Sequence, residues 1–166
     1  MRIGVFIGRF PIPIFINQLV EGLAEKGNSV FIYGSVNRQG ITKINTKLNY
    51  CTRSENKLIM GVSSVFLISK LCIYSGIEGI SILFNIYKKV DSLGSFLLRC
   101  HRIIPPLLDR LDIFHFQWAK SLCLYSEIIE NINCPIILSL RGTHINISPI
   151  TNNELGDSYT KLFKYV

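Results

Sequence analysis

The first 34 residues alternate two short apolar runs with one amphipathic segment, and this order constrains the fold more than any other feature. Residues 2–8 predict a strand that ends at Gly8. Residues 14–26 keep the three- and four-residue apolar spacing of a helix, and Gly27 follows where a helix commonly ends in a left-handed cap. Residues 29–34 predict a second strand. A strand, a helix and a strand within about 35 residues form a right-handed βαβ unit with parallel strands.

The rest of the chain continues to alternate apolar runs with helical segments. Residues 55–103 predict helices in two or three pieces, which divide near Gly76 and Gly94 and are closed by Pro105 and Pro106. The other predicted elements are strands at 48–51, 112–118 and 135–140 and helices at 121–132 and 153–166. This order predicts an α/β fold with a doubly wound parallel sheet. A length of 166 residues fits a single domain.

Basic side chains outnumber acidic ones, which indicates an anionic partner. The chain has 18 lysines and arginines against 11 acids, a formal charge of +7. This balance favours a phosphorylated substrate, an acidic membrane leaflet or nucleic acid. The basic stretch 38–57 lacks the interleaved aromatic residues of a nucleic-acid module, so no nucleic-acid partner is expected.

The chain is unusually apolar, with 48% hydrophobic residues and a mean hydropathy of +0.33. This predicts either a sheet covered on both faces or a surface that meets something apolar. Residues 62–84 are long enough to cross a membrane, but Lys70 and Glu78 interrupt them and Gly76 and Gly79 break them near the middle. Because a charge at the bilayer centre costs ~3 kcal/mol, we expect an ordinary pair of buried helices, with helices on a membrane surface as the alternative.

The five cysteines form no CxxC pair and lie mostly in apolar segments. They predict reduced, buried thiols in a cytosolic protein. No metal site is expected, because neither the cysteines nor the three histidines have ligand spacing. The apolar N-terminus is too short for a signal peptide and runs directly into Arg9 and two prolines.

Polar residues follow three predicted strands at the point where each strand ends. Because the carboxyl ends of parallel strands meet at one edge of a doubly wound sheet, we expect these residues to line one crevice. They are Gly8, Arg9, Phe10 and Pro11 after the first strand, His115, Gln117 and Trp118 at the end of the fourth, and Arg141, Gly142, Thr143 and His144 after the fifth.

The residues of this expected crevice have chemical uses and structural alternatives. Arg9 or Arg141 can pair with two oxygens of a phosphate or carboxylate. His115 can orient a hydroxyl or exchange a proton, and Trp118 offers a flat face to a sugar or an apolar chain. In the alternative interpretation, His115 and Trp118 pack in the core, while Arg9 and His144 are solvated loop residues.

Common nucleotide-binding and hydrolase motifs are missing. The first loop, "GVFIGRFP", lacks the G-x-G-x-x-G turn, so NAD or FAD is not expected as a cofactor. The sequence also contains no P-loop, no G-x-S-x-G elbow and no paired Cys/His nucleophile.

Three segments resemble the N-terminal half of family-four, group-one glycosyltransferases, which build bacterial surface polysaccharides. The segments are "FPIPIFINQLVEGLAEKGNSVFIYG", "LLDRLDIFHFQWA" and "PIILSLRGTHINISP". They occur in the order that the family shows. The middle of the chain, residues 38–105, is matched only by position and helical character.

The resemblance implies a two-domain GT-B architecture, in which residues 1–166 form the N-terminal, acceptor-binding, Rossmann-like domain. The nucleotide-sugar donor is then a co-substrate held mainly by a C-terminal domain absent from this sequence, and no cofactor or metal is expected. The parent enzyme transfers a sugar with retention to a glycan or lipid-linked oligosaccharide, and this chain alone is not expected to turn over. The implied location is the cytoplasm, at the inner face of the cytoplasmic membrane, where residues 38–57 and 58–87 are the surfaces expected to meet an anionic leaflet.

Individual residues match the family motifs to different degrees. His115 matches the family's strand histidine and is the candidate catalytic residue, while Trp118 matches the tryptophan that follows it. Arg141 stands where the family often has histidine, which implies a positioning or electrostatic role, and His144 stands where it often has aspartate. The first loop, which contains Arg9, lacks the family's "SET" and is about three residues shorter.

Two other functions fit the residues. A non-catalytic membrane-docking or acceptor-binding subunit would complete a catalytic partner supplied by another chain. An unrelated flavodoxin-like or nucleotide-binding regulatory domain would bind its ligand at the first loop.

Overall fold

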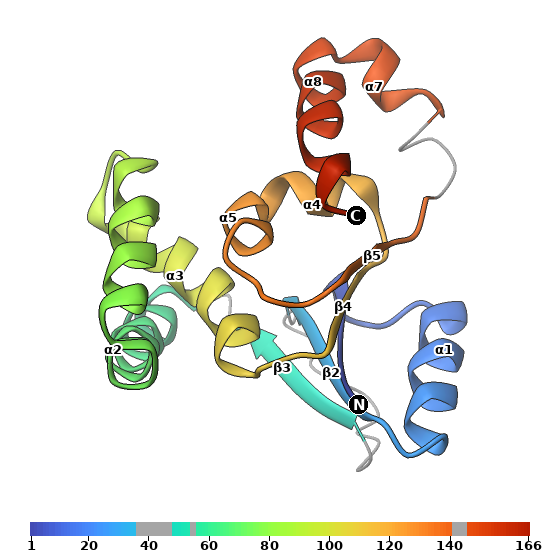
Figure 1. The fold of residues 1–166 in the computed structure, drawn as a ribbon, viewed down its shortest axis with the longest axis horizontal. Helices are drawn as coiled ribbons and strands as arrows, with labels where there is room; N and C mark the ends of the chain where they lie inside the picture. Colours follow the sequence, from blue (N-terminus) through green and yellow to red (C-terminus); the bar gives the residue numbers. More distant parts are fainter. Residues whose placement is uncertain (36–47, 54–55, 141–145) are drawn as a thin grey trace.

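The computed structural model describes residues 1–35, 48–53, 56–140 and 146–166. Within them, five parallel strands form one sheet in the order β3-β2-β1-β4-β5 (Figure 1). The strands are β1 (Arg2–Arg9), β2 (Ser29–Ser35), β3 (Leu48–Arg53), β4 (Ile113–Phe116) and β5 (Ile136–Leu138). The arrangement confirms the predicted Rossmann-like, doubly wound α/β fold.

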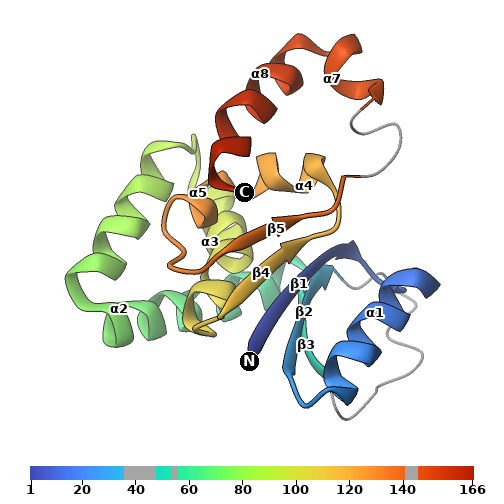
Figure 2. The same cartoon turned by 45° about the vertical axis from the view of Figure 1, so that its right-hand side comes forward.

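Helices lie on both faces of this sheet. They are α1 (Ile14–Glu25), α2 (Lys57–Lys88), α3 (Leu93–Leu108), α4 (Ala119–Leu124), α5 (Ser126–Ile129), α7 (Ser148–Thr151) and α8 (Asn153–Leu162), with a final 3-10 turn, η1 (Phe163–Tyr165). α1 packs on one face, whereas α3, α4 and α5 lie on the other, with α2 outside α3 (Figures 1 and 2).

The two faces of the sheet build two apolar cores because side chains alternate along each strand. Ile3, Val5 and Ile7 of β1 pack with α1. Phe6 points to the other face, where its ring centroid lies 4.4 Å from that of Tyr125. Burial on both faces explains why the strands appear in the sequence as nearly continuous apolar runs.

The helical block divides near Gly76 and near Gly94, as predicted, although the second break precedes Gly94. α2 continues to Lys88 and bends at Gly76, whose φ of 52° and ψ of −127° are not helical. Gly94 lies inside α3, because that helix begins earlier, where the Ser92 side chain accepts a hydrogen bond from Ser95 N at 3.2 Å.

Three other element ends also differ from expectation. Pro105 and its neighbour Pro106 lie within the last turn of α3, so they do not stop it. β4 ends at Phe116, because the chain turns at Trp118 into α4. The helix predicted over 121–132 is divided at Tyr125, whose φ of −126° separates α4 from α5.

α2 packs against α3 along one face only. Leu71, Ile82 and Ile86 are buried there, whereas apolar residues on the other side of α2 are exposed, among them Ile73 at 80% and Ile77 at 88%. The expected pair of ordinary buried helices is therefore wrong for this outer side. By length and composition alone, α2 is long and apolar enough to cross a membrane.

All five cysteines are free thiols. Cys100 is buried, as expected, but the other four are only half-buried, so the expectation of buried thiols is correct for one of them. Burial raises the pKa of the Cys100 thiol to about 12, which keeps it protonated at neutral pH.

Candidate functional site

The candidate site lies at the carboxyl edge of the sheet, between β1 and β4. The chain moves from β1 through α1 to β2 on one side, whereas β4 and β5 extend the sheet on the other side. Such a reversal of strand order opens a crevice beyond the strand ends, where α/β proteins commonly bind ligands. The segments that follow β1 and β4 therefore adjoin this crevice.

The loop after β1 is fixed by backbone geometry and by contacts with β2. Gly8 has a φ of 80°, a left-handed conformation that favours glycine. Ser35 Oγ donates a hydrogen bond to the Gly8 carbonyl oxygen at 3.2 Å, and Phe10 N donates to the Ser35 carbonyl oxygen at 2.9 Å. The Phe10 side chain is buried beside α1, so it anchors the loop, while Arg9 is exposed.

His115 pairs with a hydroxyl that the motif analysis did not single out. Its Nε2 lies 2.8 Å from Ser139 Oγ, just past the end of β5. The amide nitrogen of Gln117, a buried residue, lies 3.4 Å from each ring nitrogen of His115. The imidazole can therefore exchange a proton with a hydroxyl or hold one in place.

The face of the sheet that carries His115 is only partly covered. His115 is paired with Val5 on one side and Ile137 on the other, and α1 lies toward β2 and β3 (Figure 2). Ile137 is 46% exposed, while His115 and Ser139 are half-buried. A ligand at this edge can therefore reach both polar groups beside an apolar surface.

Trp118 was interpreted either as a packing residue or as a flat face for a ligand, and its position in the structure agrees with the first and leaves room for the second. Its half-buried ring packs against the α1-side core, and the residue immediately precedes α4. The structure therefore assigns it a packing role and leaves part of its surface at the carboxyl edge of the sheet.

The third predicted loop, Arg141, Gly142, Thr143 and His144, lies outside the described residues. The chain leaves β5 at Leu138, on the edge of the sheet that also holds the ends of β1 and β4.

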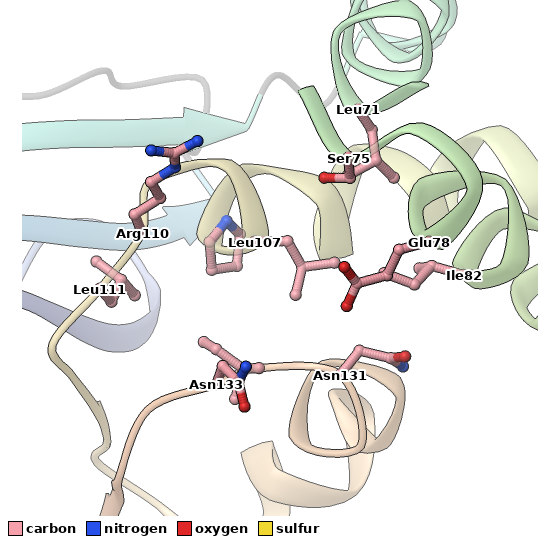
Figure 3. A pocket seen from close by; sticks show the side chains of 11 residues that line it. Leu71, Ser75, Glu78, Ile82, Leu107, Arg110, Leu111, Asn131 and Asn133 are labelled. Atoms are coloured by element: carbon pink, nitrogen blue, oxygen red, sulfur yellow. The ribbon is translucent and has the colours of Figure 1, made fainter. Parts of the chain in front are cut away.

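A cavity at the opposite edge of the sheet was missed by the sequence analysis. It has a volume of about 360 Å³ and lies between α2, the end of α3 and the segment before β5 (Figure 3). The Glu78 carboxylate turns toward it, whereas the Arg110 guanidinium points away from the two asparagines, Asn131 and Asn133 (Figure 3). Because these residues come from three separate elements, no local motif marks the cavity.

A polar cluster of the buried Tyr33 with the half-buried Cys51 and Asp109 joins the end of α3 to the sheet near this cavity. Tyr33 Oη donates a hydrogen bond to Asp109 Oδ2 at 2.5 Å, and Cys51 Sγ lies 3.8 Å from the same oxygen. Desolvation, aided by the neighbouring thiol and carboxylate, raises the pKa of Tyr33, and desolvation with Asp109 raises that of Cys51 to about 12. Both groups are therefore neutral at pH 7, and their role in the described structure is to anchor α3.

No group of three or more His, Cys, Asp or Glu side chains arranged to hold a metal ion occurs among the residues that the structure describes. In comparisons with known proteins, no family model, no curated protein and no solved structure matches the chain.

Proposed function

We propose that this chain is the acceptor-binding half of a retaining glycosyltransferase, which moves a sugar from a nucleotide sugar to a glycan or lipid-linked oligosaccharide. The observation that supports this most is the position of the three segments that resemble the family. They supply the loop after β1 with α1 and β2, and then β4 and β5, so they include strands on both sides of the switch point. The parent enzyme would work in the cytoplasm at the inner face of the cytoplasmic membrane.

The chemistry of the carboxyl edge fits a sugar ring, which has a rim of hydroxyls and an apolar face. His115 Nε2 and Ser139 Oγ can exchange hydrogen bonds with acceptor hydroxyls, and the exposed side chain of Ile137 can contact the apolar face. Arg9, which is exposed one residue beyond Gly8, supplies a cation for a phosphate group of a lipid-linked acceptor.

In this proposal His115 positions the acceptor hydroxyl while a second domain holds the donor. The acceptor oxygen forms a bond to the anomeric carbon, and the bond from that carbon to the donor phosphate breaks. The nucleoside diphosphate leaves with the bonding electrons and takes up the proton that the hydroxyl loses. This transfer consumes no redox cofactor, so none is included in the proposal.

Acceptor binding can be tested with Trp118, because it is the only tryptophan in the chain and adjoins the proposed site. Soluble bacterial-type oligosaccharides are titrated into the protein while its fluorescence is recorded. We expect saturable binding that His115→Ala weakens by about fivefold, since one hydrogen bond to a ligand is worth about 1 kcal/mol. Glu78→Gln, in the cavity at the opposite edge, serves as the matched control and should bind normally.

Failure of every oligosaccharide to bind would count against the proposal. So would binding that Glu78→Gln removes and His115→Ala retains, because the ligand would then occupy the cavity in Figure 3. Sugar transfer itself is assayed with the full product of the gene and a panel of nucleotide sugars. Transfer that depends on His115 would establish the catalytic assignment.

A non-catalytic subunit is the second candidate, because of the exposed apolar side of α2. In that case the chain would bring an acceptor or a membrane to a catalytic partner. The same assays separate the candidates, since such a subunit would bind the acceptor without transferring a sugar when nucleotide sugars are added.

A further inference from the structure

The outer side of α2 carries the largest run of exposed apolar side chains in the described part of the chain. Each of these side chains is between 56% and 88% exposed. In the first half of α2 they are Leu58, Ile59, Val62, Val65, Phe66, Ile73 and Tyr74, and in the second half they are Ile77, Ile80, Phe84 and Tyr87. We call these eleven residues the α2 outer face.

The outer face follows one side of each half of the helix. Ile77, Ile80, Phe84 and Tyr87 recur at three- and four-residue intervals, which places them on one side of the second half. In the first half the same spacing extends from Leu58 to Phe66, and the row resumes at Ile73 beyond the exposed Ser69 and Lys70. Solvent-exposed apolar rows of this length typically mark a surface that meets an apolar partner.

The inner side of α2 is fixed to the rest of the protein. Ser64 Oγ donates a hydrogen bond to the Leu97 carbonyl oxygen of α3 at 2.9 Å, and Leu71, Ile82 and Ile86 are buried in the core. Gly76 bends the helix between its two halves (Figure 1). These contacts hold α2 against the domain, which favours a helix that lies on a membrane over one that crosses it.

Lysines border the outer face, and two of them contact its aromatic rings. Lys70 Nζ lies 5.8 Å from the centroid of the Tyr74 ring, and Lys88 Nζ lies 4.3 Å from that of the Phe84 ring. Lys57 begins α2, and Glu78 is its only acidic residue. Apolar and aromatic side chains with cations beside them are the pattern of helices that bind at the interface of anionic bilayers.

We propose that α2 docks the domain in the plane of an anionic membrane, with the outer face among the lipid chains and the lysines at the headgroups. A second copy of the chain fits less well, because a two-fold contact through this face would bring the same lysines together. The proposal rests on the proposed function for its purpose, since it provides the surface by which a lipid-linked acceptor is reached.

The test is flotation of the whole 166-residue chain with vesicles of phosphatidylcholine alone or with added phosphatidylglycerol. We expect binding to the anionic vesicles that weakens as sodium chloride is raised. Ile73→Glu should weaken it at least about tenfold, because a charge replaces an apolar side chain at the lipid surface. Ile14→Glu on α1 is the matched control, since Ile14 is 79% exposed and Ile73 is 80% exposed.

Equal binding by Ile73→Glu and the parent chain would overturn the proposal, as would failure of the parent chain to float with anionic vesicles. Resistance to alkaline carbonate extraction would indicate a spanning helix, and a dimer that Ile73→Glu dissociates would indicate a second copy as the occupant; either outcome also overturns it. Far-UV circular dichroism of both variants verifies their folding.

The vesicles contain neither glycan nor nucleotide sugar, and the oligosaccharide titration contains no lipid. The docking proposal and the proposed function can therefore fail separately. Loss of vesicle binding with oligosaccharide binding intact would overturn docking alone, whereas the reverse result would support docking and count against the acceptor site.

Discussion

Replacing Gly76 by alanine tests the bend in α2 against an internal control. Gly76 has a φ of 52° and a ψ of −127°, which an alanine adopts only at a cost of about 1–3 kcal/mol. A straight helix would avoid this cost and would gain about 1 kcal/mol of helix propensity. Straightening, however, would pull the second half of α2 from the core, where Ile82 is 5% exposed and Ile86 is 0% exposed.

Burial of each of these isoleucines is worth about 1.5–3 kcal/mol, so straightening costs roughly 3–6 kcal/mol in total. The bent helix therefore persists in Gly76→Ala, and the free energy of unfolding falls by about 1–3 kcal/mol. Gly61→Ala is the control on the same helix. Gly61 has helical geometry with no atom within 4 Å of a new Cβ, so alanine should raise stability by about 0.5–1 kcal/mol.

Urea titrations followed by circular dichroism and by Trp118 fluorescence measure both variants. The two substitutions are chemically identical, yet the structure predicts opposite signs. Stabilisation of both variants by a similar amount would refute the reasoning, because it would mean that α2 is straight at Gly76 in solution. A straight α2 would also remove an argument for docking on a membrane rather than crossing it.

Other predictions concern buried polar groups. Tyr33→Phe removes the hydrogen bond to Asp109 and should lower the free energy of unfolding by about 1 kcal/mol in a urea titration. Glu127, whose side chain is 2% exposed, contacts Arg99, whose side chain is 34% exposed, at 2.8 Å, so Glu127→Ala should cost about 1–3 kcal/mol, measured as a lower Tm. The Cys100 thiol has a pKa of about 12 in the fold against an ordinary 9.0. Keeping this thiol protonated therefore contributes fully to the free energy of unfolding below pH 9, and the contribution is lost as the pH rises from 9 to 12. Cys100→Ala should therefore flatten the fall in stability across that range in pH-dependent unfolding.

The sheet could be predicted because its central strands, β1 and β2, are short apolar runs buried on both faces. The boundaries of β1 and β2 agree with the prediction within one residue. β4 was predicted too long. Gln117, just after the strand, is buried like a strand residue but does not belong to the strand. Burial and strand pairing are separate conditions, and a sequence pattern reports mainly the first.

The exposed side of α2 could not be deduced from the sequence, because this helix carries apolar side chains on all of its sides. Periodicity identifies a buried face only when the other face is polar, so Leu71 and Ile73 look alike in the sequence although one is buried and the other exposed. The pair of His115 and Ser139 was missed for a related reason. A single serine in the run "PIILSL" gives no local sign of its cross-strand partner.

The position of β1 at the centre of the sheet has a consequence for how the chain folds. Its contacts with β2 close a short loop, as between Ser35 and Gly8, which are 27 residues apart. On the other side, Arg2 N donates to Asp112 Oδ2 across 110 residues. Because closing the longer loop loses more chain entropy, the β1–α1–β2 unit is expected to form early and the pairing of β1 with β4 late. The crevice between β1 and β4 would then be among the last features of the molecule to form. A chain arrested during folding would therefore have its helices but not its site.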